Sequence, residues 1–187
     1  PYVTPAVAGA AIFRSIFNAR EERIANQVLM MFGLEPQRWI TETRPVSQLI
    51  FGGVFPNVDF SGFWAGPSLA LVTIIIFGIW TYTGYNAVIF LAGLGGISPE
   101  LYEAAQIDGA NRRQQFRFIT VPLLAPVTFY LTVLGFIGTF QAFTQIWIMR
   151  TPSSARSVDT ISVYIFETVR STDPNMGYGS AMAFVLF

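Results

Sequence analysis

The residues that could do chemistry in this chain gather in one polar connection, residues 97–126, which separates two long apolar runs. A carboxylate, two small side chains, a second carboxylate and a glycine follow one another there, at Glu103, Ala104, Ala105, Asp108 and Gly109. A glutamate beside bare alanines can pair with an arginine of another protein whose backbone approaches closely. The competing interpretation is an ordinary capped helix with a solvated face, because alanine pairs are common in helices.

The local sequence predicts that this connection is a pair of short helices joined by a tight turn. Ser98 can accept a hydrogen bond from a free amide of the first turn, and Pro99 suits the first helical position. Glu100 lies in that same turn, where the helix dipole favours an anion. The helix should end at Gly109, which readily adopts the left-handed conformation. A second short helix is predicted over residues 111–118, so that a hairpin lies outside the bilayer between two spans.

The composition excludes most catalytic chemistry. The chain has no Cys and no His, which removes thiol nucleophiles, disulfides, Cys/His metal sites and imidazole acid-base catalysts. It also lacks a GxxxxGK[ST] phosphate-binding loop, so no cofactor is expected on this chain. Eleven arginines balance eleven carboxylates without any lysine, and a net charge of zero argues against a nucleic-acid binder.

Two long runs without a charged residue must position the hairpin. Only 12% of the residues are charged, against roughly 25% in a soluble domain, and the mean hydropathy is +0.50. The charge-free runs cover residues 60–99 and 118–149, and they predict membrane-spanning helices at 67–94 and 123–147. Buried helices of a soluble protein are the alternative, but such helices are usually shorter.

The remaining segments complete the expected topology. The apolar ends, residues 1–17 and 177–187, are interpreted as the end of one membrane helix and the start of another, so the chain is expected to be incomplete at both ends. Residues 18–66 and 148–176 are polar connections, and the first should hold short helices at the membrane surface. The three connections carry four, three and three arginines, so charge alone does not give the orientation.

The spacing within the central connection resembles the EAA loop of ABC importer permeases. That family's pattern is Glu-Ala-Ala, three residues, Gly, nine residues, Ile, one residue, Leu-Pro, and here it is met by Glu103-Ala104-Ala105, Gly109, Ile119 and Val121-Pro122. Val121 in place of Leu is the one departure. Residues 80–99 and 161–183 also look like the carbohydrate-type members. Arg150-Thr151-Pro152 stands where many members carry a Thr-x-Gly-Gly-Pro turn, which leaves the contact with a binding protein and the substrate open.

The resemblance implies an all-α, polytopic membrane protein of the type I ABC importer permease kind, in a bacterial or archaeal cytoplasmic (inner) membrane. Residues 97–122 would be a cytoplasmic coupling loop, with residues 18–66 and 148–176 outside. The implied partners are an ATP-binding subunit that carries ATP and Mg²⁺, a second permease subunit and an extracytoplasmic sugar-binding protein. This chain itself would then not be an enzyme. The implied coupling residues are Glu103, Ala104, Ala105, Asp108 and Gly109.

Polar side chains inside the predicted spans are candidates for a substrate pathway, because polar groups facing lipid are costly. The candidates combine aromatic rings, amides and hydroxyls, which suit a sugar, and they are Tyr82, Tyr85, Asn86, Thr139, Gln141 and Gln145. Packing between helices is the alternative role for each of them.

The sequence leaves open other transported solutes and other classes of membrane protein. The same machine could carry a polyol, a glycerol phosphate or a polyamine, although both full spans lack carboxylates and arginines. An ion-driven secondary transporter usually needs an intramembrane acid or a broken helix, and the absence of such an acid weighs against it. A membrane enzyme lacks a catalytic set here, and only the loop argues against a purely structural subunit.

Overall fold

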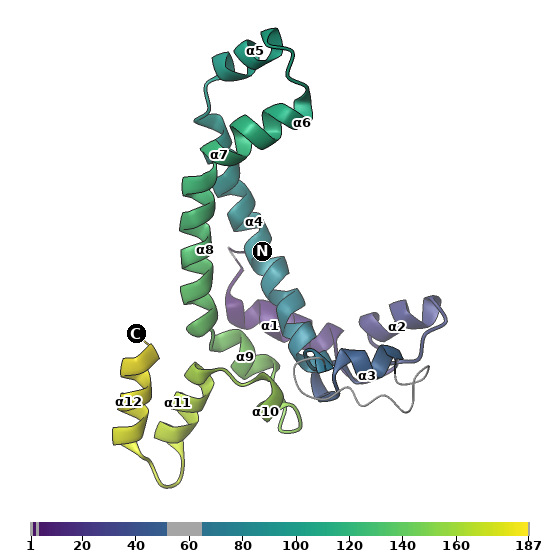
Figure 1. Cartoon of the computed structure of the whole chain (residues 1–187). Coiled ribbons are helices and arrows are strands. Elements are labelled where there is room, and N and C mark those ends of the chain that lie inside the picture. Colours follow the sequence, from purple (N-terminus) through teal and green to yellow (C-terminus); the bar gives the residue numbers. More distant parts are fainter. Residues whose placement is uncertain (1, 3, 52–64, 187) are drawn as a thin grey trace. The chain divides into compact units, whose positions relative to one another are not determined.

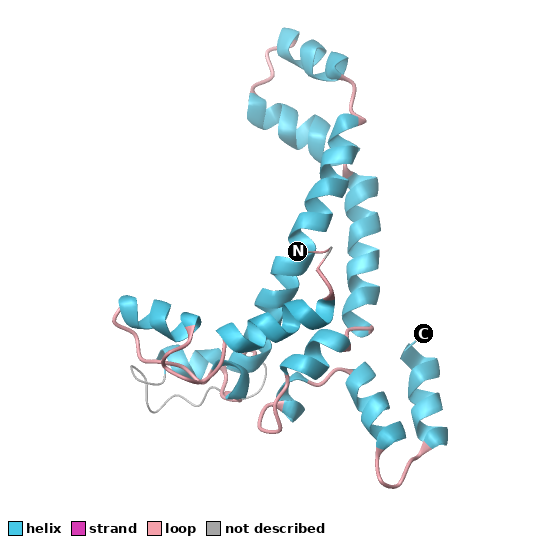
Figure 2. Cartoon of the chain, turned by 180° about the vertical axis from the view of Figure 1, so that it is seen from behind, coloured by secondary structure: helices cyan, strands magenta, loops and turns pink. Residues whose placement is uncertain are grey.

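The computed structural model describes residues 2, 4–51 and 65–186, and these residues form helices joined by short loops (Figure 1). Viewed from behind, the described part shows no strand (Figure 2). The helices in chain order are α1 (Ala6–Ile16), α2 (Ile24–Met31), the 3₁₀ turn η1 (Trp39–Thr41), α3 (Val46–Phe51), α4 (Leu69–Gly95), α5 (Pro99–Ile107), α6 (Arg112–Gln115), the π-helical turn η3 (Phe116–Thr120), α7 (Val121–Leu123), α8 (Ala125–Phe140), α9 (Thr144–Met149), α10 (Ala155–Val158), α11 (Ile161–Arg170) and α12 (Met176–Leu186). The all-α expectation is confirmed.

The chain packs as two compact units. One unit combines Pro1–Trp80 with Phe140–Phe187, and the other is Thr81–Thr139. The helix α4 contributes residues to both, and the predicted coupling loop lies wholly in the second.

The helix α4 has the length and composition of a membrane span. Its 27 residues contain no charged side chain, and at about 1.5 Å per residue it exceeds the roughly 30 Å of a hydrocarbon core. The second stretch that passes the same test is bent by 58°, between residues 112–123 and α8. Pro122 and Pro126 flank this bend, and each removes a backbone N–H from the helical ladder.

The helix predicted over residues 123–147 is divided in the structure, because α8 ends at Phe140 and α9 begins at Thr144. The Ser162 hydroxyl donates to the Phe140 carbonyl at 3.0 Å, and the Thr160 hydroxyl donates to the Ala142 carbonyl at 2.7 Å. These carbonyls would otherwise accept from the next helical turn. Side chains from the segment that follows therefore stabilise the break.

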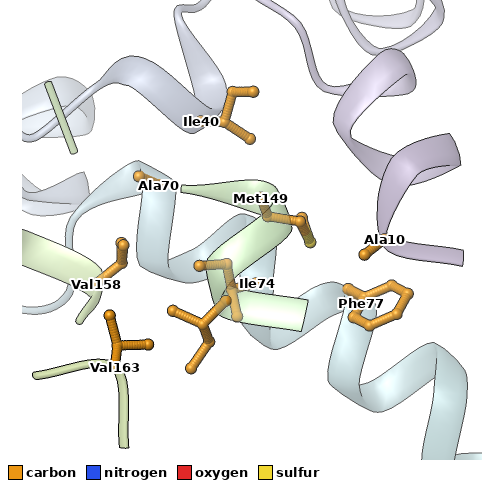
Figure 3. Packing of buried hydrophobic residues seen from close by; sticks show 9 residues of the cluster. Ala10, Ile40, Ala70, Ile74, Phe77, Met149, Val158 and Val163 are labelled. Carbon is orange, nitrogen blue, oxygen red and sulfur yellow. The ribbon is translucent and has the colours of Figure 1, made fainter. Parts of the chain in front are cut away.

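The core of the first unit forms where α1, α4 and α9 pack together (Figure 3). Its buried side chains are Ala10, Ile40, Ala70, Ile74, Phe77, Ile146, Met149, Val158 and Val163. Phe13 lies against the rings of Phe77 and Trp80, with centroids 5.1 and 5.2 Å away. The Arg14 guanidinium donates to the Ile148 carbonyl at 3.0 Å, which fastens α1 to α9.

The connection that precedes α4 is organised around one buried amide. Asn26 is fully buried, accepts hydrogen bonds from the Gln37 N–H at 3.0 Å and the Trp39 indole at 2.7 Å, and donates to the carbonyls of Arg20 and Gln37. The short helices α2, η1 and α3 lie in the predicted 18–66 connection, whose residues 52–64 lie outside the described ones. Their position at a membrane surface stays a prediction.

Candidate functional site

The first helix of the central loop begins and ends where its sequence predicts. The Ser98 hydroxyl accepts from the Glu100 N–H at 3.3 Å, and Pro99 is the first residue of α5. At the other end the Gly109 N–H donates to the Gln106 carbonyl, and the Ala110 N–H reaches back to the Ala105 carbonyl at 2.8 Å. Gly109 has φ = +82°, the left-handed conformation that this paired C-cap requires. The predicted turn is confirmed.

The second half of the loop is fixed by a reciprocal cap that was not predicted from the sequence. The Asn111 side chain accepts from the Gln114 N–H at 3.0 Å, and the Gln114 side chain accepts from the Asn111 N–H at 2.8 Å. The buried Gln115 amide also donates to the Ala110 carbonyl. The signal was an N-cap residue followed three positions later by Gln, which is the capping-box pattern.

A side-chain hydrogen bond closes the hairpin at its base. The Tyr102 and Thr120 hydroxyls lie 2.9 Å apart and join α5 to η3, and Thr120 is buried. A contact across 18 residues cannot be read from local patterns. This bond and the caps help to hold the loop that Figure 1 shows between α4 and α8.

The outer surface of α5 presents two carboxylates and one apolar side chain. Glu103 and Asp108 are exposed, and among the described residues neither forms a salt bridge. Ala104 is exposed and Ala105 is half-buried, so only one alanine of the pair is fully presented. Ile107 is 87% exposed, an unusual amount for an isoleucine. A partner that covers this surface would gain apolar burial as well as ion pairs.

The two helices that carry the loop meet closely at Gly93. A Cβ atom built at Gly93, near the end of α4, would lie 2.9 Å from Val127 Cγ2 in the first turn of α8 and 3.0 Å from Cδ2 of Leu124, which directly precedes α8. Carbon atoms do not approach that closely without a shift. Glycine at position 93 therefore allows the two helices to meet directly below the hairpin.

The six predicted pathway residues divide between the two units. Tyr82, Tyr85 and Asn86 lie on α4 and Thr139 on α8, all in the second unit. Gln141 lies exposed in the break after α8, and Gln145 is half-buried on α9, both in the first unit. Gln141 and Gln145 both follow the end of α8, so the expectation that all six lie inside continuous spans is wrong for these two, and the pathway role of the six stays a prediction.

The threonine hydroxyls of α8 donate hydrogen bonds to backbone carbonyls one turn earlier in the chain. Thr139 donates to the Gly135 carbonyl at 2.8 Å, and Thr128 and Thr132 bond the carbonyls four residues earlier in the same way. A threonine bonded like this can face lipid at little cost. Thr139 thus needs no substrate to explain it.

An ion-pair cluster in the 148–176 connection was not expected from the sequence. Arg150 donates to Asp159 at 3.0 Å and also to Glu167, and its guanidinium lies 4.4 Å from the centre of the Trp147 ring. Burial lowers the pKa of Arg150, but the hydrogen bond to Glu167 and the charge of Asp159 outweigh it and raise this pKa overall. Burial raises the pKa of Asp159, and the Arg150 charge opposes that shift. Arg150 therefore stays cationic and holds two carboxylates.

Comparison with known proteins gives one family over nearly the whole chain. The model of the "binding-protein-dependent transport system inner membrane component" family matches residues 2–187. The arabinooligosaccharides transport system permease protein AraP of Bacillus subtilis (strain 168) is 32% identical over 187 residues, covering 100% of this chain and 52% of the relative. The lactose transport system permease protein LacF of Rhizobium radiobacter is 32% identical over 190 residues, covering 100% of this chain and 55% of the relative. The chain thus spans about half the length of these relatives.

A solved structure has the same fold. A crystal structure of a bacterial ABC transporter involved in the import of the acidic polysaccharide alginate matches with a TM-score of 0.72 and 23% identity, over 99% of this chain and 56% of that chain. At this identity the likeness concerns the fold alone, which is polytopic and helical. The helices, the EAA spacing and the family match agree, and the chain belongs to the family of binding-protein-dependent transport system inner membrane components.

Proposed function

We propose that this chain is part of the permease subunit of an ATP-driven ABC importer, and that it forms part of the pathway for a carbohydrate delivered by an extracytoplasmic binding protein. The observation that carries the proposal is the capped, cross-bonded hairpin of residues 97–122, which presents the EAA motif on a membrane-protein scaffold. The family and its relatives named for arabinooligosaccharide and lactose transport support the assignment. The machine would lie in a bacterial or archaeal cytoplasmic membrane.

Coupling to ATP hydrolysis would pass through the exposed surface of α5. Glu103 pairs with a basic group of the ATP-binding subunit, which holds ATP and Mg²⁺, while Ala104 and Ile107 enter an apolar cleft beside it. Asp108 supplies a second charge and Gly109 makes the turn. The hairpin is closed by its own caps and by the Tyr102–Thr120 bond. A movement of the ATP-binding subunit that displaces α5 would therefore displace the whole hairpin.

The displacement of the hairpin would also be transmitted to the membrane spans α4 and α8. Because α4 and α8 meet closely at Gly93, the helix ends below the hairpin are displaced together and do not slide apart. A second permease subunit, whose helices face these, completes the pathway, and the two subunits alternate between outward-open and inward-open states. Residues 97–122 would then be cytoplasmic, with residues 18–66 and 148–176 on the outside.

The spans favour a neutral, hydroxyl-rich cargo. Neither α4 nor α8 contains an acid or an arginine, so a polyamine or a glycerol phosphate finds no counter-charge there. An ion-driven transporter usually uses a carboxylate inside the membrane, and α4 and α8 contain none. Tyr82, Tyr85 and Asn86 on α4 offer rings and an amide for such a cargo, whereas Thr139 is a weaker candidate because its hydroxyl is already bonded.

Uptake into proteoliposomes tests this proposal. The full-length protein is co-expressed with its genomic neighbours, reconstituted in lipid, and supplied with the binding protein, internal ATP and labelled lactose, arabinotriose, glycerol 3-phosphate or spermidine. We expect ATP-dependent uptake of one of the two saccharides. Uptake that follows an ion gradient without ATP, or that is restricted to glycerol phosphate or spermidine, would contradict the proposal.

A further inference from the structure

A cavity of about 1230 Å³ lies beside α11 and α12, within the first unit. Its wall combines aromatic and charged side chains, among them Arg156, Asp159, Tyr164, Glu167 and Tyr178. None of the pathway candidates named from the sequence lines it. The cavity is therefore a distinct place in the fold.

Two carboxylates of this wall are held in position by Arg150, which does not itself line the cavity. Asp159 and Glu167 each give one oxygen to the Arg150 guanidinium, whose side chain is only 17% exposed and which rests on the Trp147 ring. An ionised carboxylate has about four acceptor sites, so a single ion pair leaves capacity for further donors. Hydroxyl groups of a ligand are suitable donors, and the Arg156 guanidinium on the same wall supplies N–H donors in return.

The aromatic residues complete the pattern. Tyr164 on α11 and Tyr178 on α12 are each 52% exposed, although buried rings are the rule in a packed core. Exposed rings offer flat apolar faces, which suit the C–H faces of a sugar ring. The wall therefore provides stacking surfaces and both kinds of hydrogen-bonding group.

The spacing of the two helices that carry these rings is fixed. A Cβ atom built at Gly179 of α12 would lie 2.6 Å from Val169 Cγ2 of α11, so a larger residue there would force Val169 or the helices to shift. The Thr168 carbonyl also accepts from the Asn175 N–H across the turn between the helices. The cavity wall is thus formed before any ligand arrives, which lowers the ordering cost of binding.

We propose that this cavity is a binding subsite for a neutral saccharide, separate from the candidate residues on α4 and α8. The inference rests on the proposed function, in which the cargo is a carbohydrate. Two guanidinium groups and two carboxylates cancel in charge around the cavity, so neither an acidic saccharide nor a polyamine gains a net attraction. Rings and paired acceptors favour a sugar over a small linear polyol.

Protection of an introduced thiol from labelling measures occupancy directly. The 187 residues contain no cysteine, so Ala181→Cys on the cavity wall and Ser153→Cys, exposed outside the cavity, form a matched pair once other cysteines of the complex are replaced. Each variant of the assembled importer, without binding protein, is treated with a methanethiosulfonate reagent and with lactose or arabinotriose. At a concentration about three times the dissociation constant, mass action slows labelling about fourfold at Ala181→Cys. The rate at Ser153→Cys stays unchanged.

A second variant assigns the protection to this cavity. Tyr164→Ala leaves the Arg150 ion pairs in place but removes one ring, and we expect the protection of Ala181→Cys to disappear while Ser153→Cys labels as before. Protection that survives Tyr164→Ala would overturn the proposal. A thiol at Ala181→Cys that never reacts would overturn it too, because the assembled importer would then cover the cavity.

The result separates the subsite from the function on which it rests. If the importer transports lactose or arabinotriose in proteoliposomes but neither sugar slows labelling at Ala181→Cys, the subsite is refuted and the carbohydrate function stands. If neither sugar is transported and neither protects, both proposals fall.

Discussion

The contact below the hairpin gives a prediction whose magnitude can be worked from the structure. In Gly93→Ala the new methyl group would lie 2.9 Å from Val127 Cγ2 and 3.0 Å from Leu124 Cδ2. Ordinary carbon contacts are about 3.5–4.0 Å, so α4 and α8 must separate by about 0.6 Å or repack. Overpacking of this kind costs about 1–3 kcal/mol, and the helix propensity gained by replacing glycine returns at most about 1 kcal/mol.

A control two residues away isolates the clash. Gly95→Ala changes the same residue type in the same last turn of α4, where a Cβ atom meets nothing within 4 Å. The propensity terms nearly cancel between the two variants, so Gly93→Ala should be less stable than Gly95→Ala by about 1–3 kcal/mol. Adding Val127→Ala to Gly93→Ala should recover part of the loss, because the nearest clashing methyl group is removed.

Thermal unfolding of the purified complex in lipid nanodiscs ranks the three variants by stability. We expect the lowest midpoint for Gly93→Ala, an intermediate one for the double variant, and the highest for Gly95→Ala. A Gly93→Ala protein that melts with or above Gly95→Ala would refute the close approach of the two helices and, with it, their joint displacement.

Three further predictions concern the first unit. Arg150→Gln leaves Asp159 and the 42% exposed Glu167 without their cation and should cost about 1–3 kcal/mol, measured as a lower thermal midpoint, whereas an unchanged midpoint would contradict the ion-pair cluster. Asn26→Ala removes the amide that organises residues 20–39 and should speed tryptic cleavage in that segment at least several-fold; unchanged cleavage would mean that other contacts suffice. The Arg44 hydrogen bond lowers the pKa of Glu42 below its ordinary 4.5, so its stabilisation is present above that value and is lost as the pH falls through the folded-state pKa. Since Arg44 is 62% exposed, this contribution is under about 1 kcal/mol, and we expect the small fall of the thermal midpoint that its loss causes in wild type below pH 4.5 to be absent in Glu42→Gln.

The features that the sequence predicted well are those fixed by neighbouring residues. The cap at Ser98, the proline at the first position and the left-handed Gly109 all act within one or two turns, so their residue types predict the ends of α5. The long apolar run predicts α4 because its length and composition are those of a membrane-spanning helix.

The features that the sequence did not predict depend on contacts between distant residues. The break after α8 is stabilised by hydroxyls at Thr160 and Ser162, about 20 residues further along the chain, so an uninterrupted apolar run could not disclose it. The Tyr102–Thr120 bond and the approach at Gly93 likewise exist only once the helices have packed. Each of these contacts bears on how the loop or the spans are held, so the motif predicts coupling residues on and beside α5 but not the contacts that support them.

The most direct test of the central proposal, that the hairpin couples ATP hydrolysis to transport, is the stimulation of ATPase activity by the binding protein and its sugar. The full-length importer is reconstituted in lipid, and Glu103→Arg is compared with Glu35→Arg, an exposed charge reversal in the connection proposed to lie outside. We predict that Glu103→Arg loses the stimulation or fails to retain the ATP-binding subunit, while Glu35→Arg behaves as wild type. If Glu103→Arg assembles and is stimulated like wild type, the hairpin is only a connector and the proposed coupling is wrong.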